Sequence, residues 1–301
     1  MRAIYQMIEM IKNIIAEEDL KVNEFLSDHT SYKIGGPADI YVYPKNKDQL
    51  LELLQILKDE DVSFFILGKG SNILASDKGY RGCIIDLTKY FSEITIENDV
   101  INVGAGALLT TIAFTAIKNS LSGMEELAGI PGTLGGALLM NAGCYGNEIS
   151  NLVESVSFIN IENQIEELSI DKIKFGYRTS SLKDNIIIEA KLRLAKGDSA
   201  KIREQTEKFL SNRRESQPLD LPSCGSVFKR PLGNYAGKLI EDAGLKGKSI
   251  GDVEVSEKHA GFIVNKGNAT ANDIKELIKL IKNTVNEKFN IMLEEEVIYL
   301  G

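Results

Sequence analysis

The chain of 301 residues is 43% hydrophobic and 26% charged, which is the balance of a soluble globular protein and suggests about two domains. Its formal net charge of −8 argues against a general nucleic-acid binder, because such a protein needs a basic face to displace counterions. Three widely spaced cysteines and two histidines predict neither a disulfide framework nor a zinc site. No secretory h-region and no apolar run near the ~20 residues that cross a bilayer are visible, so we expect a cytoplasmic protein without membrane insertion.

The first third of the chain alternates helical and extended patterns. Apolar residues at helical spacing predict a helix over 4–15, and a leucine-rich segment predicts another over 48–60. Alternation predicts a strand over 38–43, and the apolar run 62–67 reads as a buried strand. We therefore expect an α/β unit whose strands are covered by helices.

The middle third reads as mainly antiparallel. Two hairpins are expected, with turns at Asn98–Asp99 and at Glu162–Asn163. A strand over 186–194 closes this region, and residues 195–199 are typical of a linker.

The last third begins with a charged helix over 201–214. Thr270 followed by Asp273 predicts a capping box at the start of a second, amphipathic helix. The chain then ends on a strand over 296–300. The whole pattern is that of an α/β (α+β) protein.

Two glycine-rich segments are candidates for ligand binding. Gly68-Lys-Gly-Ser-Asn72 follows an apolar strand, and its backbone N–H groups could hold a phosphate, although a strand-terminal turn is the favoured interpretation of the segment taken alone. It lacks the spacing of a Walker A loop, and Gly104-Ala-Gly106 lacks the third glycine of a Rossmann fingerprint. Residues 121–146 hold seven of the 26 glycines, which suggests a backbone-lined groove for a large flat or phosphorylated ligand.

The loop 222–231 presents a serine beside basic residues. Ser226 follows a glycine that we expect to permit close backbone approach, and Lys229 and Arg230 come directly after it. No catalytic histidine signature or G-x-S-x-G elbow surrounds Ser226, so a serine hydrolase is not favoured. Cys224 reads as a small buried thiol rather than a nucleophile. A hydroxyl donor beside an anionic ligand is the arrangement that this loop predicts.

Further charged residues fit the same picture. Arg178 offers a rigid guanidinium for a carboxylate or a developing enolate, although a surface salt bridge is the commoner role of a single arginine. In the run 294–296, strand alternation places Glu294 and Glu296 on one face, and position alone does not choose between them. His29 and His259 are interpreted as structural or hydrogen-bonding residues.

Taken together, the motifs resemble those of the UDP-N-acetylenolpyruvoylglucosamine reductase family, flavoenzymes of bacterial peptidoglycan precursor synthesis. The resemblance runs from Asn23 to Gly301, and the motifs occur in the family's order. They are His29–Gly36, Gly68–Asn72, Gly129–Gly136, Asn141–Gly143, Tyr177–Arg178, Arg213–Arg214 through Gln217–Pro218, Gly225–Ser226 and the terminal Leu293–Val297.

The resemblance implies a fold with a two-subdomain FAD-binding unit of the vanillyl-alcohol-oxidase (PCMH) type and a C-terminal α/β substrate domain. The implied boundaries are 1–88 and 89–197 for the FAD subdomains, with 33–197 forming the PCMH-type unit, and 198–301 for the UDP-sugar domain. The terminal strand 296–301 is a candidate to return to the first subdomain. The short connection from Pro231 to Lys238 indicates the class that lacks a substrate-covering tyrosine loop.

The implied reaction reduces UDP-N-acetylglucosamine enolpyruvate to UDP-N-acetylmuramate, with FAD bound and NADPH as co-substrate. In this reading Ser226 is the proton donor, and Arg178 and Glu296 stabilise the enolate-like charge. The implied cofactor contacts are Tyr32, Gly35, Gly36, Gly68, Lys69, Gly70, Ser71, Asn72, Gly129, Ile130, Pro131, Gly132, Thr133, Gly135, Gly136, Ala142 and Gly143. The implied substrate contacts are Tyr177, Arg213, Gln217, Lys229, Arg230 and Lys238. No metal is expected, and a monomer is expected.

One position departs from the family pattern, because Ile298 stands where an arginine usually follows the catalytic glutamate by two residues. Two rival functions are considered. Another FAD-dependent oxidase or dehydrogenase would keep the glycine segments but would not need Ser226, Arg178 and Glu296 together. A non-catalytic UDP-sugar sensor would bind no flavin and consume no NADPH.

Overall fold

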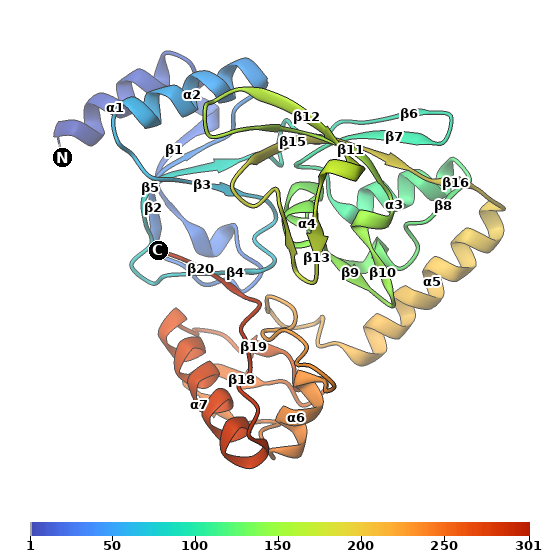
Figure 1. Cartoon of the computed structure of the whole chain (residues 1–301). Coiled ribbons are helices and arrows are strands. Elements are labelled where there is room, and N and C mark those ends of the chain that lie inside the picture. Colours follow the sequence, from blue (N-terminus) through green and yellow to red (C-terminus); the bar gives the residue numbers. More distant parts are fainter. Residues whose placement is uncertain (1) are drawn as a thin grey trace. The chain divides into compact units, whose positions relative to one another are not determined.

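The structure, a computed structural model, describes residues 2–301 and the side chains from residue 7 onward. The chain divides into two units, each discontinuous in sequence (Figure 1). The first comprises residues up to 22, 40–69 and 82–211, and the second comprises residues 23–39, 70–81 and 212–301. Each unit has its own buried core. The domain boundaries expected from the sequence stay a prediction.

The first unit contains a five-stranded antiparallel sheet with the order β12–β11–β15–β7–β6. Its strands are β6 (Ile94–Glu97), β7 (Val100–Gly104), β11 (Val153–Ile159), β12 (Ile165–Ser169) and β15 (Ile186–Arg193). Both predicted hairpins are confirmed, because Glu97 pairs with Val100 and Ile159 pairs with Ile165. Asn98 and Asn163 adopt left-handed backbone in these turns, which asparagine tolerates better than most residues.

A four-stranded sheet has the order β1–β2–β5–β3, and the boundary between the units falls within β1, β2 and β5. Its strands are β1 (Leu20–Phe25), β2 (Pro37–Val42), β5 (Tyr80–Asp86) and β3 (Phe64–Leu67). In the first unit β3 runs parallel to β5. The sequence predicts a buried strand over 62–67, but in β3 only Leu67 is buried and Phe64 is exposed, so the expected burial is wrong for most of the strand. The reason is that β3 lies at the edge of the sheet, whereas residues 83–86 of β5, which pair on both sides, are buried.

The helices of the first unit include the three that the sequence predicts over 4–15, 48–60 and 201–214, and two that it did not predict. They are α1 (Arg2–Lys12), α2 (Lys47–Asp59), α3 (Leu109–Lys118), α4 (Leu134–Met140) and most of α5 (Ser199–Ser216). The first predicted helix ends three residues early, although Ile15 beyond it is still buried; the side chain of Ile4 lies outside the described residues. The α2 helix is capped by Asn46, whose side chain accepts a hydrogen bond from the Gln49 backbone.

The predicted linker over 195–199 is wrong at both ends. Ala195 and Lys196 form the short strand β16, which pairs with β8 (Leu121–Ser122), and α5 already begins at Ser199. The polar composition of residues 195–199 gives no sign of a strand. The strand depends on its partner β8, which lies more than seventy positions earlier in the chain. Further two-residue strands of the first unit are β9 (Gly143–Cys144), β10 (Asn147–Glu148), β13 (Phe175–Gly176) and β14 (Thr179–Ser180).

The second unit is built around α7 (Ala271–Phe289), which packs against α6 (Ala236–Asp242) and a small antiparallel sheet (Figure 1). The sheet has the order β17 (Ser249–Ile250), β18 (Val253–Val255) and β19 (Ile263–Asn265). The C-terminal strand β20 (Ile298–Leu300) runs parallel to β4 (Ile73–Ala75). The apolar stripe of α7 is buried as its spacing predicts, at Ile274, Leu277, Ile278, Ile281 and Val285.

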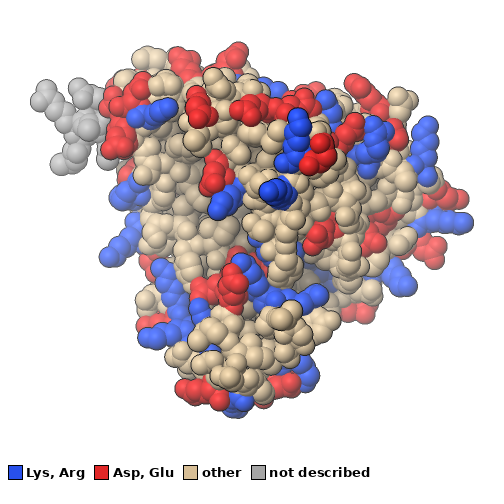
Figure 2. Space-filling view, viewed as in Figure 1, with Lys and Arg blue, Asp and Glu red and all other residues tan. Residues whose placement is uncertain are grey.

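The surface carries mixed charge. Figure 2 shows Lys and Arg interspersed with Asp and Glu over the visible face. Among residues 2–301, none of the helices has the length and apolar character that spanning a bilayer demands.

The capping box of α7 gives a test of the second unit. The Thr270 hydroxyl accepts from the Asp273 backbone at 3.1 Å, and the Asp273 carboxylate accepts from the Thr270 backbone at 2.9 Å. We expect Thr270→Ala to lower the free energy of unfolding by about 1 kcal/mol, measured by urea unfolding. Lys279→Ala, on the exposed face of the same helix, is the control and should change it by less than ~0.5 kcal/mol. Equal midpoints for the two variants would contradict the role of the cap.

Candidate active site

Ser226 lies in the second unit on a short extended segment that is hydrogen-bonded along both edges. On one side Ser226 forms an antiparallel bridge with Phe262, and the Val227 N–H donates to the Gly261 carbonyl at 2.9 Å. On the other side Phe228 bridges Glu295, and the Glu296 N–H donates to the Val227 carbonyl at 2.8 Å. The structure therefore brings Ser226 and Glu296, two of the three predicted catalytic residues, onto adjacent backbone segments.

The side chain of Ser226 is half-buried, and its hydroxyl donates to the Phe228 carbonyl at 3.2 Å. The preceding Gly225 has φ of 80°, yet a Cβ atom on it would meet nothing within 4 Å. The expectation of close backbone approach at Gly225 is thus wrong. Glycine is favoured at position 225 because most residues with a side chain avoid the left-handed backbone conformation. The turn at Gly225 sets the direction in which the chain enters Ser226.

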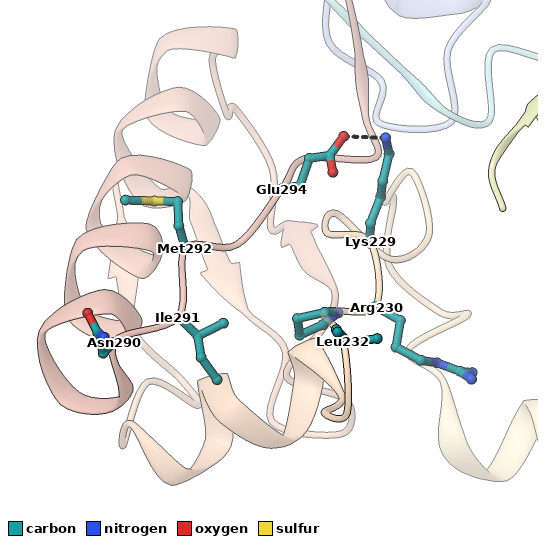
Figure 3. A pocket seen from close by; sticks show the side chains of 8 residues that line it. Lys229, Arg230, Leu232, Asn290, Ile291, Met292 and Glu294 are labelled. Carbon is teal, nitrogen blue, oxygen red and sulfur yellow. Dashed lines mark hydrogen bonds and ion pairs between the residues drawn. The ribbon is translucent and has the colours of Figure 1, made fainter.

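The three consecutive glutamates have different surroundings. Glu294 is exposed and forms an ion pair with Lys229 (Figure 3). Glu295 is half-buried; burial opposes its ionisation, but hydrogen bonds from Lys282 and Tyr299 outweigh that effect and lower its pKa. Glu296 is half-buried as well, and its carbonyl accepts from the Asn72 side chain at 2.9 Å.

Cys224 is buried, as its sequence context predicts. Burial raises the pKa of its thiol to about 12, and the nearby Glu296 carboxylate acts in the same direction. The thiol therefore stays protonated, which does not suit a nucleophile.

Arg178 lies in the first unit, in the turn of the β13–β14 hairpin. Its φ of 56° is a strained conformation for a residue with a side chain, and such outliers gather at functional sites. Its guanidinium donates to the Gly143 carbonyl at 3.3 Å and stacks 5.0 Å from the centre of the Tyr177 ring. The third predicted catalytic residue is thus held beside Gly143, a predicted cofactor contact.

Two side-chain hydrogen bonds fix this hairpin against the end of α4. The Asn141 amide donates to the Gly176 carbonyl at 3.2 Å, and the Ser180 hydroxyl donates to the Leu139 carbonyl at 3.0 Å. Asn141 ends α4 in left-handed backbone with φ of 46°. The motif Asn141–Gly143 is noted in the sequence, but its role in holding the arginine hairpin depends on contacts between distant segments.

The glycine-rich segment 129–136 turns into α4. The Thr133 side chain accepts from the Gly136 backbone and caps the helix, and a Cβ on Gly68 would lie 2.3 Å from the Thr133 hydroxyl. Pro131 and Gly136 are exposed, and a Cβ on Gly136 would meet only the Thr133 hydroxyl, at 3.6 Å. The segment therefore presents backbone that side chains leave uncovered.

The predicted cofactor residues fall in both units. Those in the first unit are Gly68, Lys69, Gly129, Ile130, Pro131, Gly132, Thr133, Gly135, Gly136, Ala142 and Gly143, and those in the second are Tyr32, Gly35, Gly36, Gly70, Ser71 and Asn72.

Tyr32 is fully buried in the core of the second unit, where its hydroxyl faces the Cys224 thiol and has no nitrogen or oxygen partner among the described residues. A Cβ on Gly36 would lie 2.2 Å from the Asp77 carbonyl, and one on Gly70 would lie 2.2 Å from the His29 carbonyl. Close backbone contacts account for these two glycines, and the cofactor assignments stay predictions.

Among the predicted substrate residues, Tyr177 belongs to the first unit and the others to the second. Lys229 and Arg230 border an open hollow of about 430 Å³ together with Leu232, Met292 and Glu294 (Figure 3). Arg230 stacks 4.9 Å from the Tyr235 ring centre.

Two other predicted substrate residues have distinct surroundings. Lys238 forms an ion pair with Asp242. Gln217 has a buried side-chain oxygen without a hydrogen-bond partner among the described residues. Arg213 lies near the end of α5.

Comparison with protein families assigns both parts of the chain. Residues 38–169 match the FAD binding domain model, and residues 217–300 match the model of the UDP-N-acetylenolpyruvoylglucosamine reductase C-terminal domain. The 4-ethylphenol oxidase of Gulosibacter chungangensis shares the fold over 64% of this chain and 43% of its own, at 11% identity and a TM-score of 0.52. The FAD-binding part is of the vanillyl-alcohol-oxidase (PCMH) type, as predicted.

Full-length relatives share much more. The UDP-N-acetylenolpyruvoylglucosamine reductase of Caldanaerobacter subterraneus is 46% identical over 98% of both chains, and that of Clostridioides difficile is 45% identical over 96% of both. The crystal structure of the Thermus caldophilus enzyme matches with a TM-score of 0.81 at 32% identity, over 94% of this chain and all of that one. The chain belongs to the UDP-N-acetylenolpyruvoylglucosamine reductase family.

Proposed function

We propose that the chain reduces UDP-N-acetylglucosamine enolpyruvate to UDP-N-acetylmuramate, with FAD as cofactor and NADPH as reductant, in peptidoglycan precursor synthesis. The observation that carries this proposal is the 46% identity over 98% of both chains. We propose Ser226, Arg178 and Glu296 as the residues that carry out this reaction, on the motifs in which they stand.

The residues of the first unit fit FAD. The exposed backbone at Pro131 and Gly136 leaves room for a flat or phosphorylated group, and a Cβ at Gly136 would project into that room. We infer that segment 129–136 holds the cofactor together with Gly68 and Gly143. When bound, FAD takes hydride from NADPH and delivers it to the enolpyruvyl double bond.

Ser226 is the proposed proton donor to the substrate carbon that becomes negative. A serine hydroxyl has too high a pKa to donate readily, so it must lie directly against the developing charge. The glycine turn at 225 and the hydrogen bonds on both edges of the Ser226 segment support this role, because they restrict where the hydroxyl can point.

Arg178 and Glu296 are proposed to stabilise the enolate-like charge. The guanidinium is a rigid donor group, and its contacts with Gly143 and Tyr177 hold it beside the turn in which Arg178 lies. Glu296 is preferred to Glu294 because Glu294 is exposed and already paired with Lys229. Lys229, Arg230, Lys238 and Gln217 are proposed substrate contacts.

We also propose the division into FAD subdomains 1–88 and 89–197 and a UDP-sugar domain 198–301. The pairing of β20 with β4 supports a return of the C-terminal strand to residues of the N-terminal region. We further propose that the protein acts in the cytoplasm and as a monomer.

The direct test is NADPH oxidation by the purified protein under anaerobic conditions, with and without UDP-N-acetylglucosamine enolpyruvate. We expect a yellow protein that consumes NADPH in stoichiometric proportion to that substrate. A flavoprotein that stops after one reduction of its flavin would indicate a different dehydrogenase, and a colourless protein that cannot be reconstituted with FAD would refute the enzyme.

Ser226→Ala should separate the two half-reactions. Reduction of the flavin by NADPH should change little, whereas reoxidation by substrate should slow by about 10²- to 10⁴-fold, because only the second half-reaction needs the proton. Rapid mixing with detection of flavin absorbance measures both rates. Equal losses in the two half-reactions would remove Ser226 as the proton donor.

Glu296→Gln should damage turnover by about 10²- to 10³-fold, the usual effect of losing a group that stabilises transition-state charge. Glu294→Gln is the matched control, since it alters a neighbouring exposed carboxylate by the same chemical change. Steady-state turnover of both variants decides the assignment. A larger loss in the control would show that the choice of glutamate is wrong.

A further inference from the structure

His259 lies in the turn that joins β18 to β19, and its ring has a defined protonation pattern. The Gly261 N–H donates to His259 Nδ1 at 3.1 Å. A backbone N–H can only donate, so Nδ1 must be unprotonated, and a neutral ring then carries its hydrogen on Nε2. The ring thus holds the backbone of its own turn through one nitrogen.

The residues that follow His259 hold the Ser226 segment. The Gly261 carbonyl accepts from the Val227 N–H at 2.9 Å, and Phe262 forms the bridge with Ser226 itself. The Phe262 N–H donates to the His259 carbonyl at 2.9 Å, and the two rings meet edge to face at 4.9 Å. A continuous chain of contacts therefore runs from the imidazole through Gly261 and Phe262 to the Val227 N–H and to the bridge at Ser226.

The space between the imidazole and the serine hydroxyl is small. A Cβ on Gly261 would lie 2.9 Å from His259 Cε1 and 3.4 Å from Ser226 Oγ, so both groups border the same point. A Cβ on Gly237, in α6, would lie 3.2 Å from both His259 Cε1 and the Gly261 nitrogen. The ring lies between α6 and the turn. Because the packing there is tight, a smaller or displaced side chain at position 259 should alter the packing next to the Ser226 hydroxyl.

The surroundings of the ring favour its neutral form. Burial lowers the pKa of His259 below its ordinary value of 6.5. A hydrogen bond with the backbone of His259 itself opposes this effect in part, Lys246 lowers the pKa further, and Glu241 raises it. Lys246 and Glu241 themselves form an ion pair at 3.1 Å. Near neutral pH the imidazole therefore keeps Nδ1 available as an acceptor.

We propose that His259 is a positioning residue for the proton donor Ser226: its Nδ1 holds Gly261, and Gly261 and Phe262 fix the segment that carries the hydroxyl. The inference rests on the proposed function, since it concerns the step in which Ser226 delivers its proton. It assigns no contact between His259 and the substrate.

Two variants of His259 distinguish the effect of its hydrogen-bond acceptor from the effect of its size. Asparagine can place its amide oxygen near the position of Nδ1, whereas leucine has comparable bulk and no acceptor. We expect His259→Leu to slow flavin reoxidation by substrate about 10- to 100-fold more than it slows flavin reduction by NADPH, because small misplacements of a reacting group have effects of this size. His259→Asn should recover most of that difference.

Two structural measurements accompany the kinetics. In the native protein, ¹⁵N NMR of labelled histidine should show His259 Nδ1 unprotonated at neutral pH. Amide hydrogen exchange should show a protected Gly261 N–H that loses protection in His259→Leu and retains it in His259→Asn. If His259→Leu fails to fold, the NMR spectrum of the native protein and the asparagine variant still decide the matter.

Equal slowing of both half-reactions in His259→Leu, native rates in that variant, or a protonated Nδ1 would each overturn the inference. If the enolpyruvyl substrate does not reoxidise the reduced flavin of the native protein, the proposed function is refuted instead. The Gly261 exchange measurement distinguishes the two failures, since it reports the hydrogen bond without any turnover.

Discussion

Residues 226–229 are hydrogen-bonded to other segments along both of their edges. The candidate site in the second unit depends on this constraint. Gly261 and Phe262 border one edge of this segment, and Glu294 to Glu296 border the other, where the Lys229 N–H also donates to the Glu294 carbonyl. A segment held on two sides cannot shift its register without breaking both sets of bonds. The serine and the glutamate therefore keep their mutual position even though the segment is neither a regular strand nor a helix.

The second support of Glu296 comes from a residue far away in sequence. Asn72 donates through its side chain to the Glu296 carbonyl and accepts through its backbone from the Ile298 N–H, just where β20 joins β4. The loop that the sequence presents as a phosphate-binding candidate thus also anchors the glutamate. The departure at Ile298 is compatible with this geometry, because the residue is used for its backbone pairing and its side chain is partly exposed.

Local patterns predicted most of the elements because each depends on its own residues: the two hairpin turns, the capped α7 helix and its buried stripe, and the buried thiol at Cys224. The catalytic candidates were identified from short motifs and their order. Sequence could not show that Arg178 occupies a left-handed turn, because arginine has no preference for it. It also missed the strand at Ala195–Lys196 and the anchoring roles of Asn72 and Asn141, since each depends on a partner supplied by a distant segment.

The discontinuity of the second unit has a consequence for synthesis of the chain. Residues 23–39 and 70–81 are made early, but β4 finds its partner only when β20, at residues 298–300, leaves the ribosome. The early segments must wait for a partner 225 positions further along the chain, and long-range closure of this kind is slow. A protein cut before residue 298 would therefore lose the β4–β20 pairing and the hydrogen bond from the Ile298 N–H to the Asn72 carbonyl, beside the loop that holds Glu296.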